Sequence, residues 1–89
     1  MSNALLLAEV KAALLARFPG AQVNVIDDSA AHHGHSGHGG AAHLRVEIGS
    51  TALAGLSLIQ QHRLIYQTLD PFMGSRVHAL QIRILENPS

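Results

Sequence analysis

The sequence contains no cysteine, which excludes a disulfide framework and any metal site built from the chain's own thiolates. Soft-metal chemistry would therefore have to use histidine or the thiol of a partner protein. Aromatic residues make up only 3% of the chain, against 47% hydrophobic residues overall. The core must therefore be built mainly from aliphatic side chains.

The chain also lacks an excess charge and a long apolar segment. Six basic and six acidic side chains cancel, which argues against binding nucleic acid by bulk charge. No apolar run approaches the ~18 residues that a membrane span needs. The amino terminus has no basic head of the kind that precedes the apolar part of a signal peptide. We therefore expect a cytoplasmic protein of 89 residues, folded as a single domain with no membrane association.

The first half of the chain predicts one helix followed by two strands. Apolar residues at helical spacing predict a helix over 4–17, which Pro19 and Gly20 end. Strict alternation predicts a short strand around Val23 and Val25 and a second one from His43 to Ile48. We expect these strands to form an antiparallel hairpin. The predicted inner stripe of the helix is Leu7, Val10, Leu14 and Phe18.

Residues 28–42, between the two strands, are rich in glycine and histidine and show no periodicity. Such a composition predicts a long flexible loop. Four of the seven histidines of the chain lie in it: His32, His33, His35 and His38.

The second half predicts helix, turn and strand. Ser57 and Gln60 have the spacing of a capping box, which defines the start of a helix. Asp70 and Pro71 end this helix and suit the start of a short helical turn. The predicted inner stripe of the helix is Leu58, His62, Ile65 and Leu69, and one face of the following strand is predicted to carry His78, Leu80, Ile82 and Ile84.

This order of elements predicts an α+β domain with the sequence helix, strand, strand, helix, short helix, strand. The helices should cover one face of a three-stranded mixed sheet. The last connection is long enough for a right-handed crossover, so the last strand should lie parallel to one of the first two.

Histidine is the residue type that points to function, because neutral imidazole is a good ligand for iron, zinc, nickel and copper. The alternative for the loop histidines is that they are solvated and bind nothing. His78 at the start of a strand is equally compatible with a bond to a backbone carbonyl. From the pattern alone, His43 and His62 are interpreted as structural.

Two segments, residues 62–66 (His-Arg-Leu-Ile-Tyr) and 77–80 (Val-His-Ala-Leu), resemble the signature of the BolA family. The acidic and serine residues of 25–29 and His43 before the second strand resemble further family features. The resemblance runs from about residue 23 to residue 84. It implies a fold related to the type II KH architecture.

The resemblance also implies a function. BolA-like proteins are non-catalytic adaptors, which bind a monothiol glutaredoxin and share a bridging 2Fe-2S cluster with it and its glutathione. It implies His78 and a loop histidine, best matched by His32, as the ligands of this chain. The alternates are His33, His35, His38 and His43.

Arg63 and Arg76 are expected to bind the partner, since arginine recognises the carboxylates of glutathione well; ordinary solvated charge is the alternative. Alone, the chain is expected to be a monomer or weak homodimer. A second hypothesis is a transcriptional regulator that binds DNA, and a third is a metal-binding protein that uses the loop alone. Against the second, the Gly-x-x-Gly pattern at 34–37 lies between two strands and not between two helices.

Overall fold

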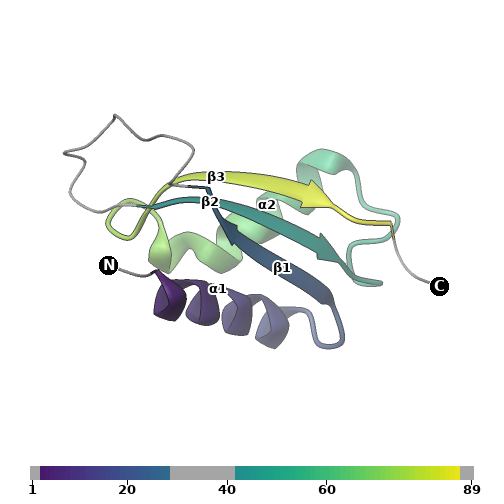
Figure 1. Ribbon diagram of the computed structural model, residues 1–89. Helices are drawn as coiled ribbons and strands as arrows, with labels where there is room; N and C mark the ends of the chain where they lie inside the picture. The colour runs from purple at the N-terminus through teal and green to yellow at the C-terminus, as the bar shows by residue number, and fades with distance from the viewer. Residues whose placement is uncertain (1–2, 29–41, 87–89) are drawn as a thin grey trace.

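The computed structural model describes residues 3–28 and 42–86 (Figure 1). The predicted order of elements is confirmed. The elements are helix α1 (Ala4–Arg17), strands β1 (Gln22–Asp27) and β2 (Ala42–Gly49), helix α2 (Leu58–Leu69), the 3-10 turn η2 (Asp70–Phe72) and strand β3 (Val77–Ile84). The histidines of residues 29–41, and the flexible loop predicted there, lie outside the described residues.

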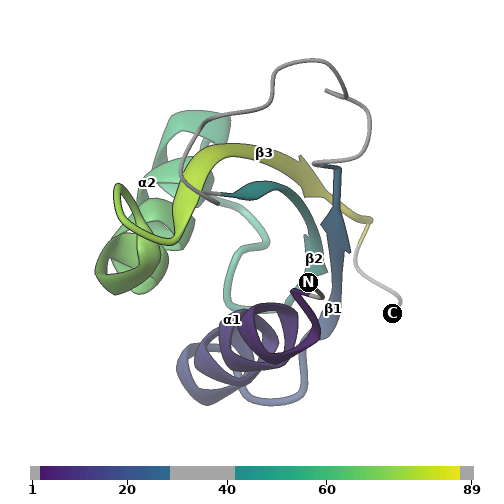
Figure 2. The ribbon, with the colours of Figure 1, turned by 60° about the vertical axis from the view of Figure 1, so that its left-hand side comes forward.

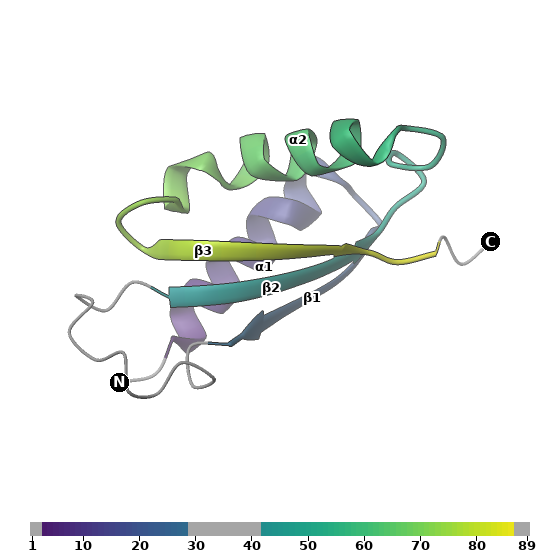
Figure 3. The ribbon, with the colours of Figure 1, turned by 90° about the horizontal axis from the view of Figure 1, so that it is seen from above.

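The three strands form one mixed sheet in the order β1-β2-β3. β1 is antiparallel to β2, with Val25 opposite Val46, and β3 is parallel to β2, with Ile82 opposite Val46. Both helices lie on the same face of this sheet, as Figures 2 and 3 show from two directions. We call the opposite face, which neither helix covers, the open face. The predicted mixed sheet with helices on one side is therefore confirmed.

β2 is the central strand, and its alternate side chains form the middle of the core. Leu44, Val46 and Ile48 are at most 2% exposed. They pack with Val10, Leu14 and Phe18 of the α1 region and with Ile65 and Leu69 of α2. Burying such aliphatic side chains contributes about 1.5–3 kcal/mol each, which explains how a core with so few rings is sufficient.

One predicted core position is wrong, and another is confirmed only in part. The buried stripe of α1 begins at Leu6, whereas Leu7 is half-buried and packs against the core. α1 carries apolar residues on several faces, so its sequence alone does not determine which stripe turns inward. In α2, Leu58 is 62% exposed because the first turn of the helix extends beyond the core.

The predicted capping box at the start of α2 is confirmed in both directions. The backbone N–H of Gln60 donates to the Ser57 hydroxyl oxygen at 3.2 Å, and the backbone N–H of Ser57 donates to the Gln60 side-chain oxygen at 3.0 Å. At the other end of α2, η2 provides the predicted short turn, and Gly74 follows it with a φ of 91°. A positive φ of this size favours glycine over residues with a Cβ.

No helix within residues 3–28 and 42–86 is long and apolar enough to cross a membrane.

Candidate metal and partner site

A β-bulge interrupts the pairing of β2 with β3 at His78. Ala42 lies opposite Val77, but the next residue of β2, His43, lies opposite Ala79. His78 is therefore an extra residue in β3 with no opposite residue in β2. Bulges of this kind bend the strand and redirect the side chain at the insertion.

The bulge corrects the predicted face of His78. The sequence alternation grouped His78 with Leu80, Ile82 and Ile84 on an apolar face. In the structure, Val77 is the buried residue, at 2% exposure, and His78 is exposed. The prediction is wrong because alternation assumes an unbroken strand, whereas the bulge shifts the phase by one residue between Val77 and Leu80.

His78 lies beside His43, with 5.2 Å between the two ring centroids and 41° between the ring planes. His43 is half-buried and alternates with the buried Ala42 and Leu44, which places its side chain on the open face. The two histidines therefore meet on the open face, near the start of both strands. The structure brings together the predicted ligand His78 and its alternate His43.

The other histidine that the structure describes does not join this pair. His62 is half-buried in α2, in the helical layer on the opposite side of the sheet. Its predicted structural role stays a prediction. The remaining predicted ligands, His32, His33, His35 and His38, lie outside the described residues, in the segment that ends directly before Ala42.

The distance between the rings fits two ligands of one metal atom. Two imidazoles that bind a tetrahedral ion through nitrogens at about 2.0–2.1 Å have ring centroids roughly 5 Å apart. Within residues 3–28 and 42–86 there is no group of three or more histidine, cysteine, aspartate or glutamate side chains that could hold a metal ion. A metal atom bound by His43 and His78 would therefore need ligands from beyond these residues.

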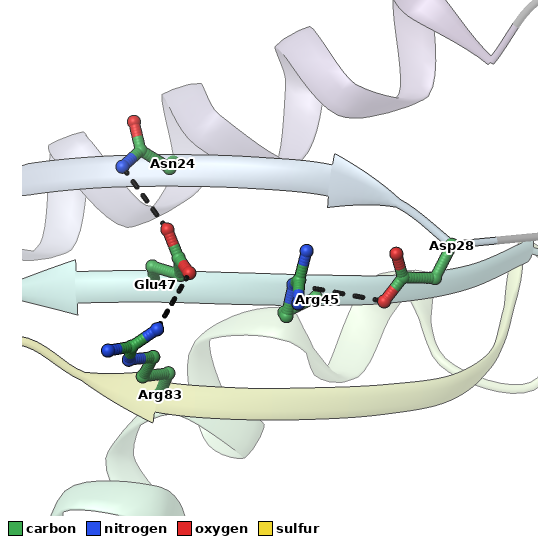
Figure 4. Close-up of polar contacts among 5 residues, drawn as sticks. All are labelled: Asn24, Asp28, Arg45, Glu47 and Arg83. Carbon is green, nitrogen blue, oxygen red and sulfur yellow. Dashed lines mark hydrogen bonds and ion pairs between the residues drawn. The ribbon is translucent and has the colours of Figure 1, made fainter.

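Farther along the open face, charged side chains pair with one another across the strands (Figure 4). Glu47 of β2 contacts Arg83 of β3 at 3.7 Å and accepts a hydrogen bond of 3.4 Å from Asn24 of β1. Arg45 lies 3.8 Å from the carboxylate of Asp28. These contacts balance the two cations of the face with two carboxylates. The face therefore offers no surplus of positive charge to a phosphate backbone.

Arg76, a predicted partner-binding residue, contacts another part of the chain. Its guanidinium donates to the Glu9 carboxylate of α1 at 2.5 Å and lies over the Phe72 ring, 5.7 Å from its centroid. This pairing could not be predicted from the sequence, because Glu9 and Arg76 are 67 residues apart. Arg76 joins the turn before β3 to α1, and a partner carboxylate would have to compete with Glu9.

Arg63, the other predicted partner-binding residue, is exposed on α2 and pairs with no carboxylate among the described residues. With Tyr66, Gln67 and Asp70 it lines a shallow depression of about 340 Å³. The Tyr66 hydroxyl donates to the backbone oxygen of Leu80 at 3.1 Å, which fixes this side of α2 to the free edge of β3. Arg63 thus lies on the surface that flanks the strand carrying His78.

The sequence contains one weak sign of the histidine pair. Val77 and Leu80, the apolar residues on either side of His78, are three positions apart, and a regular strand would place them on opposite faces. Both turn toward the core, which requires an extra residue between them. Sequence reasoning could have found the bulge from this break in phase, but not the position of His43 beside His78.

A two-layered α+β fold with this order of strands defines a class of small domains, and comparisons with known proteins identify its family. Residues 14–87 match the family model described as BolA-like protein. The chain belongs to the BolA family.

Individual relatives agree with this assignment. The chain is 36% identical over 75 residues to an uncharacterised protein in the cobS 5′ region of Sinorhizobium sp., covering 78% of this chain and 77% of that protein. It is 39% identical over 67 residues to SufE-like protein 1, chloroplastic/mitochondrial, of Arabidopsis thaliana, covering 68% of this chain but only 18% of that protein.

The structure is also similar to solved structures. The BolA domain of SufE1 from Arabidopsis thaliana superposes with a TM-score of 0.77 at 32% identity, and each chain is covered to 91%. BolA1 from Mus musculus gives a TM-score of 0.74 at 28% identity, covering 93% of this chain and 65% of that one. The predicted BolA-like fold is confirmed.

The contact between Arg76 and Glu9 should stabilise the fold slightly. Because both side chains are about two-fifths exposed, we expect a coupling of about 0.2–1 kcal/mol, which decreases at high salt. Urea unfolding of Arg76→Ala, Glu9→Ala and the double variant measures it. The matched control is the longer pair Arg83–Glu47, at 3.7 Å, for which we expect a smaller coupling. An Arg76–Glu9 coupling no larger than that of the control would contradict the interpretation.

Proposed function

We propose that this chain is a non-catalytic adaptor, which binds a monothiol glutaredoxin and shares a bridging 2Fe-2S cluster with it. The observation that carries the proposal is the pair of imidazoles on the open face, the exposed His78 and the half-buried His43, with 5.2 Å between ring centroids. If His78 were the only metal ligand on this face, a second histidine beside it would not be needed. Membership of the BolA family supports the same function.

The available side chains fit a cluster with mixed ligands. The chain has no cysteine, so it supplies imidazole nitrogens, while the active-site thiolate of the partner and its glutathione would supply the sulfur ligands. When bound, a cluster with histidine in place of thiolate has a raised reduction potential, which suits transfer or sensing of iron. The function would be iron-sulfur cluster trafficking or iron regulation.

His78 is the first ligand in this proposal. The resemblance of the sequence to the family implied His32 as the second, with His33, His35, His38 and His43 as alternates. Among them, His43 is supported by its distance from His78. The segment 29–41, which contains the other four candidates, ends two residues before His43 in the sequence.

The proposed partner surface runs from the histidine pair around the edge of β3 to α2. Arg63 is the cation on this surface that has no carboxylate among the described residues, so it is suited to a carboxylate of the bound glutathione. Arg76 stays a proposed partner contact, but Glu9 already accepts its hydrogen bond. We therefore propose that Arg63 contributes more to partner binding.

No described surface favours the nucleic-acid hypothesis over the adaptor. The cations of the open face are paired, and the Gly-x-x-Gly pattern belongs to the connection between β1 and β2. A KH-type contact requires that pattern between two helices.

The ligand role of His78 predicts a spectroscopic difference. The chain is mixed with a cluster-loaded monothiol glutaredoxin, and visible absorption and circular dichroism are recorded for wild type, His78→Ala and Gln81→Ala. Wild type and Gln81→Ala should change the cluster spectrum, while His78→Ala should not, because it lacks the ligand. Gln81 is the control because it is also an exposed β3 residue. Since His78 is exposed, the variant should stay within about 0.5 kcal/mol of wild-type stability.

If His78→Ala changes the spectrum as wild type does, the proposal is wrong. If it behaves as expected, His43→Ala identifies the second ligand. Loss of the spectral change assigns that role to His43, and its retention assigns the role to a histidine of residues 29–41.

The role of Arg63 predicts a loss of partner affinity. Removing a charge-assisted hydrogen bond should weaken binding of the glutathione-loaded glutaredoxin by roughly tenfold in Arg63→Ala. Arg76→Ala should have a smaller effect because Glu9 holds Arg76, and Arg83→Ala serves as the control. Isothermal titration calorimetry measures the three affinities. The proposal about Arg63 fails if the loss in Arg63→Ala does not exceed the loss in Arg76→Ala.

A further inference from the structure

A groove separates α1 from the outer edge of β1, away from the histidine pair. α1 runs along β1 in the opposite direction, and Figures 1 and 2 show the two elements side by side. The groove has a volume of about 460 Å³. At the end of β1 that lies beside the start of β2, the side-chain amide of Asn3 donates to the Asp27 carboxylate at 2.7 Å and joins α1 to β1. Its lining is mainly apolar and includes Leu7, Ala8, Val25, Ile26 and Lys11.

The edge of β1 along this groove presents backbone groups that the sheet does not use. β1 is an edge strand, with β2 as its neighbour. The N–H of Asp28 donates to the carbonyl of His43, the residue opposite it, so this is a hydrogen-bonded pair. Hydrogen-bonded pairs alternate along antiparallel strands, so the N–H and C=O groups of Val23 and Val25 point away from β2. No other described element hydrogen-bonds to them.

The side of α1 that borders the groove is apolar with a single charge. Leu7 is half-buried, Ala8 is exposed and Leu15, farther along the same side, is 36% exposed. Lys11 forms no ion pair within the described part of the chain. The other charged residue at the groove, Glu47, already contacts Arg83 and Asn24. The uncompensated charge of the groove is therefore positive.

We propose that this groove binds an extended peptide segment of another protein, which adds to the sheet as a fourth strand beside β1. The backbone of the segment pairs with Val23 and Val25, as in other cases where a peptide extends an exposed sheet edge. Its alternate side chains point toward α1, where Leu7 and Ala8 contact an apolar residue. An acidic residue of the segment faces Lys11.

A second copy of the chain is a poorer occupant. If the β1 strands of two copies paired side by side, the groove would receive a second Lys11. It would not receive a carboxylate that is still without a partner. Along β1, Asp27 accepts a hydrogen bond from Asn3, and Asp28 contacts Arg45. Charge complementarity therefore favours an acidic peptide over self-association.

The probes are fluorescein-labelled peptides of eight residues, in which valine alternates with threonine and a single aspartate is moved through every position. A second set carries lysine in place of aspartate. Fluorescence anisotropy with the full chain measures binding, and amide shifts in a ¹⁵N-labelled sample locate it. We expect saturable binding in the aspartate set, shifts at Val23 and Val25, and binding about 5-fold weaker for Lys11→Glu. Arg17→Glu, a charge reversal at the end of α1, is the matched control and should bind as wild type does.

Backbone pairing is tested separately, without altering the protein. Peptides N-methylated at every second residue are made in both phases, and only the phase whose N–H groups face β1 should lose binding. The proposal is wrong if no peptide binds saturably up to about 1 mM. It is also wrong if Lys11→Glu and both methylated phases bind as well as the controls. If the Val23 and Val25 amides shift with protein concentration alone, the occupant is a second copy and the proposal is overturned.

Discussion

The pairing of β2 with a neighbour on each side determines how the other elements are arranged. β2 forms an antiparallel ladder with β1 and a parallel one with β3, and its inward residues Leu44, Val46 and Ile48 are the centre of the core. A parallel neighbour requires a long connection, which α2 and η2 provide on the same face as α1. Neither helix covers the opposite face, and His43 and His78 both lie on it.

The bulge in β3 places the proposed ligand His78 on this face. In a regular strand, Val77 and Leu80 would lie on opposite faces because they are three positions apart. A regular strand could therefore not turn both residues toward the core. Inserting His78 keeps both apolar residues in the core and directs the imidazole to the open face beside His43. The bulge therefore explains both how Val77 and Leu80 turn toward the core and why the proposed ligand His78 lies on the open face. The charged pairs farther along the same face, such as Arg83 with Glu47, leave the histidines as the side chains proposed to bind a metal.

Most of the fold could be predicted from local patterns. The capping box at Ser57, the turn at Asp70 and the alternation in β2 depend on neighbouring residues and are confirmed. The errors have non-local causes. The burial of Leu6 in place of Leu7 depends on how a helix with apolar residues on several faces docks, and the exposure of Leu58 depends on where the core ends.

The candidate site was predictable in composition but not in geometry. His78 and the lack of cysteine were evident from the sequence, and the family resemblance gave the proposed ligands. The face of His78 was predicted wrongly, because a bulge depends on the register with β2 and not on β3 alone. The contact of Arg76 with Glu9 was not predictable either, because it joins residues far apart in the chain. The roles of His32 and the other histidines of residues 29–41 stay predictions.

The most direct test of the account is a nuclear Overhauser experiment on the isotope-labelled chain without partner or metal. The bulge predicts cross-peaks between the ring protons of His43 and His78, and cross-strand backbone peaks that place Ala79 opposite His43. If the peaks place His78 opposite His43 in a regular ladder and the two rings show no contact, the bulge is absent. The histidine pair, and the site built on it, would then be contradicted.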